Sequence, residues 1–146
     1  MRNEIILTVP DLPDLDLSAN RRRTRHFMQQ STDTAKERLR AGLLLKEAKR
    51  VAWMDNNLHR AKSLYPKSDW ETLPVPVALH WTLHWPTGIR ARDADGCADL
   101  LKPYQDAMVD LGWIKNDSPR YVRRVSYESV PSSLKGPSMT LRIESI

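Results

Sequence analysis

Residues 76 to 85 alternate between apolar and polar side chains more strictly than any other part of the chain. One side of this segment carries large apolar residues only: Val77, Leu79, Trp81, Leu83 and Trp85. A period of two is typical of a strand with one buried face. The sequence therefore predicts a strand over 76–85, and weaker alternation predicts others over 4–9, 121–130 and 138–145. The link 131–137, which contains glycine between two prolines, predicts a hairpin between the last two strands.

Two further segments repeat apolar residues with the period of an α-helix. We expect the first to begin between residues 31 and 34, because Thr34 and Glu37 have capping-box spacing. Its apolar stripe is Ala41, Leu44, Leu45, Ala48, Val51 and Ala52. The second helix is expected over 99–111, and its stripe is Leu100, Tyr104, Ala107, Met108 and Leu111. Gly112 ends it, while Pro103 favours a start near Leu101 or a kink.

These elements together predict an α+β domain in which a mixed sheet packs against two main helices. The chain has 146 residues, which suffices for a single domain spanning 1–146. Its one cysteine, Cys97, excludes an internal disulfide and a cysteine-based zinc site, and favours a reducing cytoplasm. No apolar run approaches about 18 residues and no signal pattern is present, so we expect neither a membrane span nor secretion.

The positive charge is concentrated in one region of the chain. The net charge is +5, and residues 18–70 hold 13 Lys and Arg against 5 Asp and Glu. Within this region, Arg21, Arg22, Arg23 and Arg25 form a cluster. Such a cluster can neutralise phosphates and release counterions, so we expect it to bind DNA. A solvated surface or arm without a ligand is the alternative that composition leaves open.

The acidic residues are distributed differently. Six of the eighteen lie between Arg90 and Ser118. The strand just before them favours an extended backbone for Asp93 and Asp95, which would direct both carboxylates to one side, roughly 6–7 Å apart. Two such carboxylates repel each other unless a cation lies between them, and their hard oxygens suit Mg²⁺, with Mn²⁺ as the alternative ion. A solvated turn is the competing interpretation.

Four motifs in this acidic block carry a family resemblance: Arg92-Asp93-Ala94-Asp95, Leu101-Lys102, Asp106-Ala-Met-Val-Asp-Leu-Gly112 and Asn116-Asp117-Ser118-Pro119. The block resembles the RusA family of Holliday junction resolvases, especially its phage members, and the flanking segments match more loosely. Two positions depart from the family pattern. Gly96 stands where the family usually has Asn, and Asn116 stands where it often has Asp.

The resemblance implies a Mg²⁺-dependent, structure-specific endodeoxyribonuclease that resolves Holliday junctions or related branched DNA by paired phosphodiester hydrolysis. It implies a homodimer acting in DNA recombination and repair, in the cytoplasm of a bacterial or phage-infected cell. By the resemblance, Asp93, Asp95 and Asp117 would be the catalytic metal ligands and Lys102 the catalytic lysine. Arg90 and Arg92, which adjoin the carboxylates, are candidates for positioning the DNA backbone.

Other functions stay open at this point. A non-catalytic basic DNA-binding protein derived from the same family would keep the basic region and lose the metal. A different metal-dependent phosphoryl-transfer enzyme acting on nucleotides is disfavoured, because the sequence has no G-x-x-x-x-G-K-[ST] phosphate loop. A small structural or toxin-like module would carry the acidic block as an ordinary surface. His80 and His84 share one strand face, but the sequence offers no matching third zinc ligand.

Overall fold

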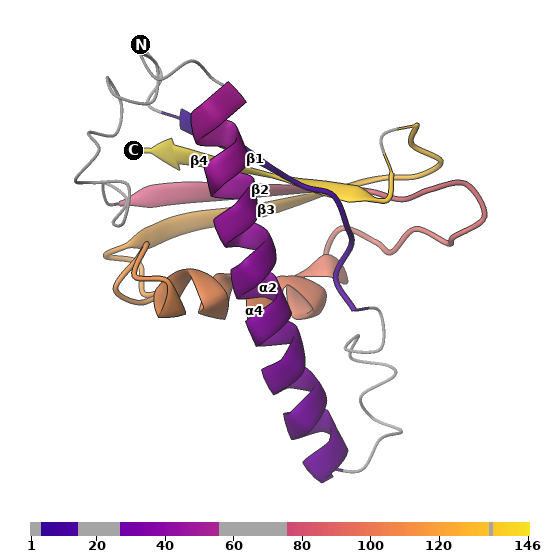
Figure 1. The fold of residues 1–146 in the computed structure, drawn as a ribbon, viewed down its shortest axis with the longest axis horizontal. Helices are drawn as coiled ribbons and strands as arrows, with labels where there is room; N and C mark the ends of the chain where they lie inside the picture. The colour runs from indigo at the N-terminus through magenta and orange to yellow at the C-terminus, as the bar shows by residue number, and fades with distance from the viewer. Residues whose placement is uncertain (1–3, 15–26, 56–75, 135) are drawn as a thin grey trace.

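The computed structural model describes residues 4–14, 27–55, 76–134 and 136–146. Its elements are β1 (Glu4–Val9), α2 (Phe27–Asp55), β2 (Val77–His84), α4 (Cys97–Asp110), β3 (Val122–Val130) and β4 (Ser138–Ser145). The strands form one four-stranded mixed sheet, and both helices pack on it (Figure 1). The prediction of an α+β domain with two main helices is confirmed.

Each predicted strand is present within one residue of its expected bounds, but the predicted hairpin is wrong. The order of strands in the sheet is β1-β4-β2-β3. The last strand, β4, is antiparallel to both β1 and β2, whereas β3 is parallel to β2. As a result, β4 lies inside the sheet and β3 forms one of its edges.

Burial explains why β4 takes the inner place. Three of its side chains are at most 1% exposed: Met139, Leu141 and Ile143. In β3, by contrast, Arg123 and Arg124 are exposed, which suits an edge. The link from β3 to β4 crosses the end of β2, where a Cβ on Gly136 would lie 2.7 Å from the carbonyl oxygen of His84. Glycine is therefore required for this close approach.

The core lies between one face of the sheet and the two helices. The predicted apolar face of β2 is confirmed, since its side chains are at most 1% exposed: Val77, Leu79, Trp81, Leu83 and Trp85. The predicted stripe of α2 is confirmed by four buried residues: Ala41, Leu45, Ala48 and Ala52. Leu44 is only partly buried and Val51 is 40% exposed. At 100° per residue, their side chains point roughly 60–80° away from that of Ala41, on one side of the buried stripe. They are therefore turned away from the sheet.

Both helices begin earlier than predicted. The first, α2, begins at Phe27 rather than at 31–34, and α4 begins at Cys97. Pro103 lies inside α4 at a buried position, so the later start that it favoured is wrong. Proline has no N–H, so the carbonyl of Asp99, four residues earlier, loses its helical hydrogen bond. Asp99 is exposed, so water can take the place of that bond. Gly112, with φ of +76°, ends the helix as predicted.

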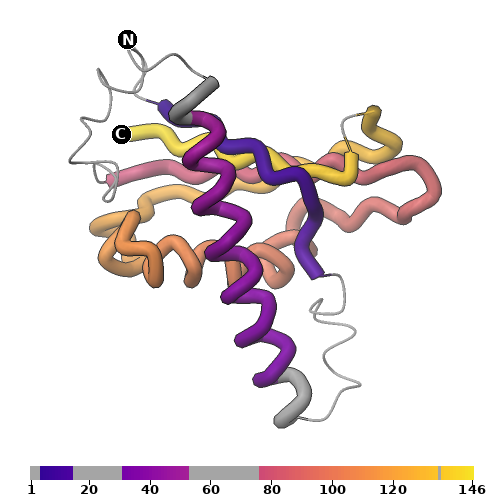
Figure 2. Tube along the Cα trace, in the orientation of Figure 1, coloured from indigo at the N-terminus to yellow at the C-terminus, as the bar shows by residue number. Residues whose placement is uncertain are grey.

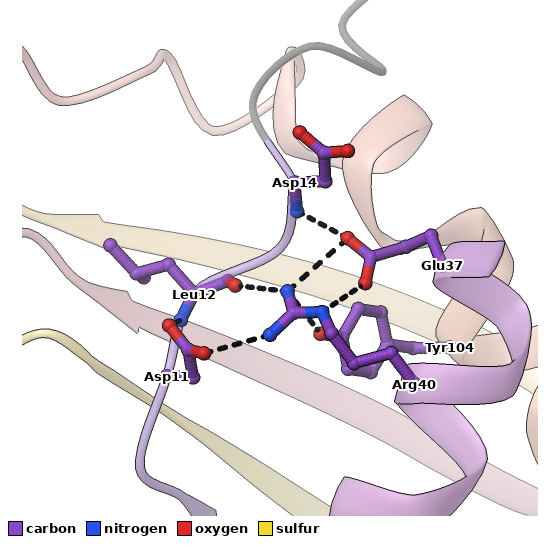
Figure 3. Close-up of polar contacts among 6 residues, drawn as sticks. All are labelled: Asp11, Leu12, Asp14, Glu37, Arg40 and Tyr104. Atoms are coloured by element: carbon purple, nitrogen blue, oxygen red, sulfur yellow. Dashed lines mark hydrogen bonds and ion pairs between the residues drawn. The ribbon is translucent and has the colours of Figure 1, made fainter. Parts of the chain in front are cut away.

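A polar network centred on Arg40 joins α2 to the segment after β1 and to α4 (Figure 3). The Arg40 guanidinium lies 2.6 Å from Glu37 and 2.7 Å from Asp11. It also donates to the carbonyl of Leu12 at 2.8 Å and to the Tyr104 hydroxyl at 3.4 Å. The side chain of Glu37 is 1% exposed, so Arg40 is the partner that makes its burial tolerable.

Replacing Arg40 with Met should lower the free energy of unfolding by about 2–3 kcal/mol, because Glu37 would be left as a buried carboxylate without its cation. The loss is below that of a fully buried pair, since the Arg40 side chain is 38% exposed. Urea unfolding measures the change. Arg50→Met is the control, because Arg50 pairs with Glu47 on the same helix at an exposed position. Equal losses in the two variants would contradict the special role of the Arg40 network.

Candidate active site

Asp93 and Asp95 lie in the loop between β2 and α4, just before the helix begins. Figure 2 shows the chain reversing direction in this loop. Residues 94–96 form a turn, so the predicted extended backbone is wrong. The N–H groups of Cys97 and Ala98 bond the carbonyls of Ala94 and Asp95 at 3.2 and 3.4 Å, which tightens the chain into α4. Asp95 also accepts the N–H of Gly96 on its own side chain at 3.1 Å, a local bond that favours a turn.

The loop is tied to the edge strand β3 through Ser129. The Ser129 hydroxyl donates to the carbonyl of Arg92 at 2.6 Å and accepts the indole N–H of Trp85 at 2.8 Å. Because Trp85 is fully buried, this chain of bonds connects the loop just before Asp93 to the core. Arg92 is partly buried and Arg90 is exposed.

Cys97 is the first residue of α4 and follows the loop that carries Asp93 and Asp95. Its thiol donates to the carbonyl of Asp93 at 3.4 Å. Burial, together with the smaller effects of the Asp95 and Asp93 charges, raises the pKa of Cys97 to about 11. The thiol is therefore protonated at neutral pH and serves as packing at the helix start.

Lys102 lies between two carboxylates on the exposed side of α4. Its ammonium group is 2.8 Å from Asp117 and 3.2 Å from Asp106. The hydrogen bond to Asp117 raises the pKa of Lys102, and the same bond lowers the pKa of Asp117. Both groups are therefore charged at neutral pH. Lys102 and Asp117, two of the predicted site residues, lie fifteen residues apart in the chain and form this ion pair in the structure.

Asn116 shapes the loop that presents Asp117. Its side-chain oxygen accepts the N–H of Ser118 at 2.9 Å, which closes an Asx turn around Asp117. An aspartate at this position could accept the same bond. Asparagine at this position therefore closes the turn without placing a second negative charge beside Asp117.

Tyr127 links the edge strand β3 to α4. It lies on β3, and Gln105 of α4 donates a hydrogen bond to its hydroxyl at 3.2 Å. Burial raises the pKa of Tyr127, which the Cys97 thiol also raises and the Lys102 ammonium lowers. The Lys102 ammonium is therefore close enough to act on Tyr127 electrostatically. The sequence did not identify Tyr127 or Gln105, because their contact depends on placing β3 beside β2 and α4.

The predicted three-carboxylate set is not gathered. Among the residues that the structure describes, no group of three His, Cys, Asp or Glu side chains lies close enough to hold a metal ion. Asp117 is held by Lys102, while Asp93 and Asp95 are exposed and make no ion pair with any described residue. Their hard oxygens fit Mg²⁺ in type and accessibility. The residues present therefore fit an ion bound by Asp93 and Asp95, but not a preassembled site that includes Asp117.

Exposed cations surround the loop that holds Asp117. They are Lys115, Arg120, Arg123 and Arg124. None makes an ion pair with another residue in the described part of the chain. Arg123 is the extra residue of a bulge, since Val122 pairs with Val77 and Arg124 with Ala78. Sequence analysis assigned phosphate binding instead to Arg21, Arg22, Arg23 and Arg25, which lie outside the described residues.

The two histidines of β2 make separate contacts on the sheet surface. His80 bonds the hydroxyl of Ser126 and lies 3.5 Å from Glu128. His84 lies 3.3 Å from the hydroxyl of Ser133. Each ring is thus engaged with its own neighbours rather than with the other.

Comparisons with known proteins do not assign the chain to a family. Neither a scan against models of protein families nor a search of curated proteins finds a match. In the described part of the chain, neither helix is both long and apolar enough to cross a membrane. The proposed function therefore rests on the geometry and chemistry of the site itself.

Proposed function

We propose that this protein is a Mg²⁺-dependent, structure-specific endodeoxyribonuclease, similar to the RusA family, that resolves Holliday junctions or related branched DNA. The observation that supports this most is the Lys102–Asp117 ion pair at 2.8 Å. It joins Lys102 of α4 to Asp117 in the loop after that helix, and the other two proposed catalytic residues, Asp93 and Asp95, lie just before the same helix. Exposed arginines on the adjoining strand supply positive charge for a polyanionic substrate.

The site residues have distinct roles in this proposal. Asp93 and Asp95 would hold Mg²⁺, which when bound supplies Lewis-acid stabilisation and an activated water. Lys102 would neutralise the negative charge that builds on the phosphate during cleavage. Asp117 and Asp106 favour the charged form of Lys102 and hold its ammonium group between them. Asp117 becomes available to a metal only when phosphate competes for the lysine.

A homodimer follows from the geometry of the substrate. Resolution of a four-way junction needs cuts on two strands of like polarity. An isologous pair of subunits presents two identical sites related by a twofold axis, which matches that symmetry. We place the dimer in the cytoplasm of a bacterial or phage-infected cell, where it would act in recombination and repair.

A non-catalytic DNA-binding protein is the second candidate, and one specific observation favours it. Asp117 is engaged by Lys102, and the described residues contain no gathered set of three metal ligands. Such a protein would bind branched DNA through its cations without cutting it. The two functions differ in their response to Mg²⁺, which only the nuclease needs for product formation.

A gel assay with three synthetic substrates tests the proposal. A four-way junction, a fork and a linear duplex of equal length are incubated with the protein in Mg²⁺ and in EDTA. We expect Mg²⁺-dependent cleavage of the branched substrates and little cleavage of the duplex. Tight junction binding without cleavage in Mg²⁺ or Mn²⁺ would favour the non-catalytic protein instead.

The exposed arginines of β3 should contribute to DNA affinity through the backbone. Replacing both Arg123 and Arg124 with Ala should weaken binding to junction and duplex alike, because both DNAs present phosphates and phosphate contacts carry no sequence information directly. On duplex, the slope of log K against log salt should fall by about 0.9 for each lost contact. Lys36→Ala with Lys46→Ala, two exposed lysines of α2, is the charge-matched control. Equal slope changes in both double variants would argue against a contact surface at β3.

A further inference from the structure

One polar face of α4 carries Lys102, Gln105 and Asp106, which lie at positions i, i+3 and i+4. Lys102 is exposed, and the other two are partly buried. Gln105 extends from this face to the edge strand and donates to the Tyr127 hydroxyl at 3.2 Å. The tyrosine ring is half-buried, and its hydroxyl meets α4 at Gln105, one turn along the helix from Lys102. Tyr127 thus reaches the side of α4 that carries the lysine, although it comes from another element.

Among the described residues, the Tyr127 hydroxyl makes one of the two hydrogen bonds that it could make. A tyrosine hydroxyl can accept a hydrogen bond and donate one. The Tyr127 oxygen accepts its hydrogen bond from Gln105. Within residues 4–14, 27–55, 76–134 and 136–146, no group accepts a hydrogen bond from the Tyr127 hydroxyl. Because burial raises the pKa of Tyr127, the group keeps this proton at neutral pH. A donor without a partner, next to a cation, is suited to an anionic oxygen.

We propose that the Tyr127 hydroxyl donates a hydrogen bond to a non-bridging oxygen of the scissile phosphodiester, beside the Lys102 ammonium. This inference rests on the proposed nuclease function and adds a second phosphate-binding group to it. Gln105 is then a positioning residue. It donates a hydrogen bond to the Tyr127 oxygen, so the hydroxyl hydrogen points away from Gln105 and can be donated to the phosphate. The ligand class is a phosphodiester oxygen, and no base contact is involved.

Three variants test this assignment. Tyr127→Phe removes the hydroxyl and keeps the ring, and we expect it to lower the single-turnover cleavage rate in Mg²⁺ about 10- to 100-fold, as for one hydrogen bond to a charged group. Gln105→Met removes the tie between α4 and β3 but keeps the donor, so its rate loss should be several-fold smaller. Tyr121→Phe, at the entrance to the same strand, should leave the rate unchanged. Junction affinity in EDTA and the midpoint of thermal unfolding are measured for all three.

The outcomes separate a phosphate contact from a structural bond. A large rate loss for Tyr127→Phe alone, with thermal midpoints like that of Gln105→Met, supports the contact. Equal rate losses for Tyr127→Phe and Gln105→Met would show that the hydroxyl only ties the strand to the helix, and would overturn the inference. Unchanged cleavage by Tyr127→Phe would overturn it while leaving the nuclease function standing. Wild-type protein that does not cleave would overturn the nuclease function and this inference together.

Discussion

Replacing Asp95 with Asn should abolish Mg²⁺-dependent cleavage of a four-way junction and leave junction binding intact or slightly tighter. Asn is nearly isosteric with Asp, and its side-chain oxygen can still accept the N–H of Gly96, so the turn before α4 should survive. The change removes one negative charge from the proposed Mg²⁺ ligands, and a neutral amide is a poorer ligand for a hard cation. The same change reduces repulsion of the DNA phosphates when no metal is bound.

Catalysis and affinity should therefore move in opposite directions, which an ordinary solvated turn does not predict. The measurement pairs junction cleavage in Mg²⁺ with gel-shift affinity in EDTA. Asp110→Asn is the matched control. Asp110 is an exposed carboxylate at the end of α4, and it pairs with Arg38. Wild-type cleavage rates in Asp95→Asn would contradict the assignment of this carboxylate to a metal.

The second large effect concerns Lys102. Lys102→Ala should lower the cleavage rate by about 10²-fold or more, by analogy with removal of one donor that stabilises a developing charge. Junction affinity should change far less, because the interaction strengthens only as charge builds on the phosphate. Lys46→Ala, at an exposed position of α2, should change neither quantity. Parallel losses of rate and affinity would make Lys102 a simple backbone contact.

Lys102→Ala also frees two carboxylates, and this affects how the result is interpreted. Without the ammonium, Asp117 and Asp106 lose the cation that separates them. Lys102→Arg keeps the charge but changes the geometry of the donors. Partial recovery of the rate in the arginine variant would indicate that charge at this point matters more than the exact donor position.

The fold could be predicted well where burial is local to a strand or helix. The five apolar side chains of one β2 face identify that strand, and the structure buries all of them. The partners of a strand cannot be identified in the same way. The short link after β3 suggested a hairpin, yet β4 pairs with β1 and β2, because its more apolar face fills the middle of the sheet.

The contacts within the candidate site depend on the same distinction. Lys102 and Asp117 were identified from motifs, and their contact requires only α4 and the loop that follows it. The backbone of Asp93 and Asp95 was predicted as extended from the preceding strand, but local bonds from Cys97 and Gly96 fold it into a turn. Tyr127 escaped detection because its contact with Gln105 depends on the parallel pairing of β3 with β2.

The most direct test of the proposed function uses a supercoiled plasmid with an extruded cruciform, which contains one four-way junction. Two symmetric cuts across the junction by a homodimer convert the plasmid to linear molecules whose nicked ends can be sealed by DNA ligase. Our account predicts this ligatable linear product in Mg²⁺ with wild-type protein, and none with Asp95→Asn. Persistence of uncut supercoiled plasmid at protein concentrations that saturate the junction, in both Mg²⁺ and Mn²⁺, would contradict it.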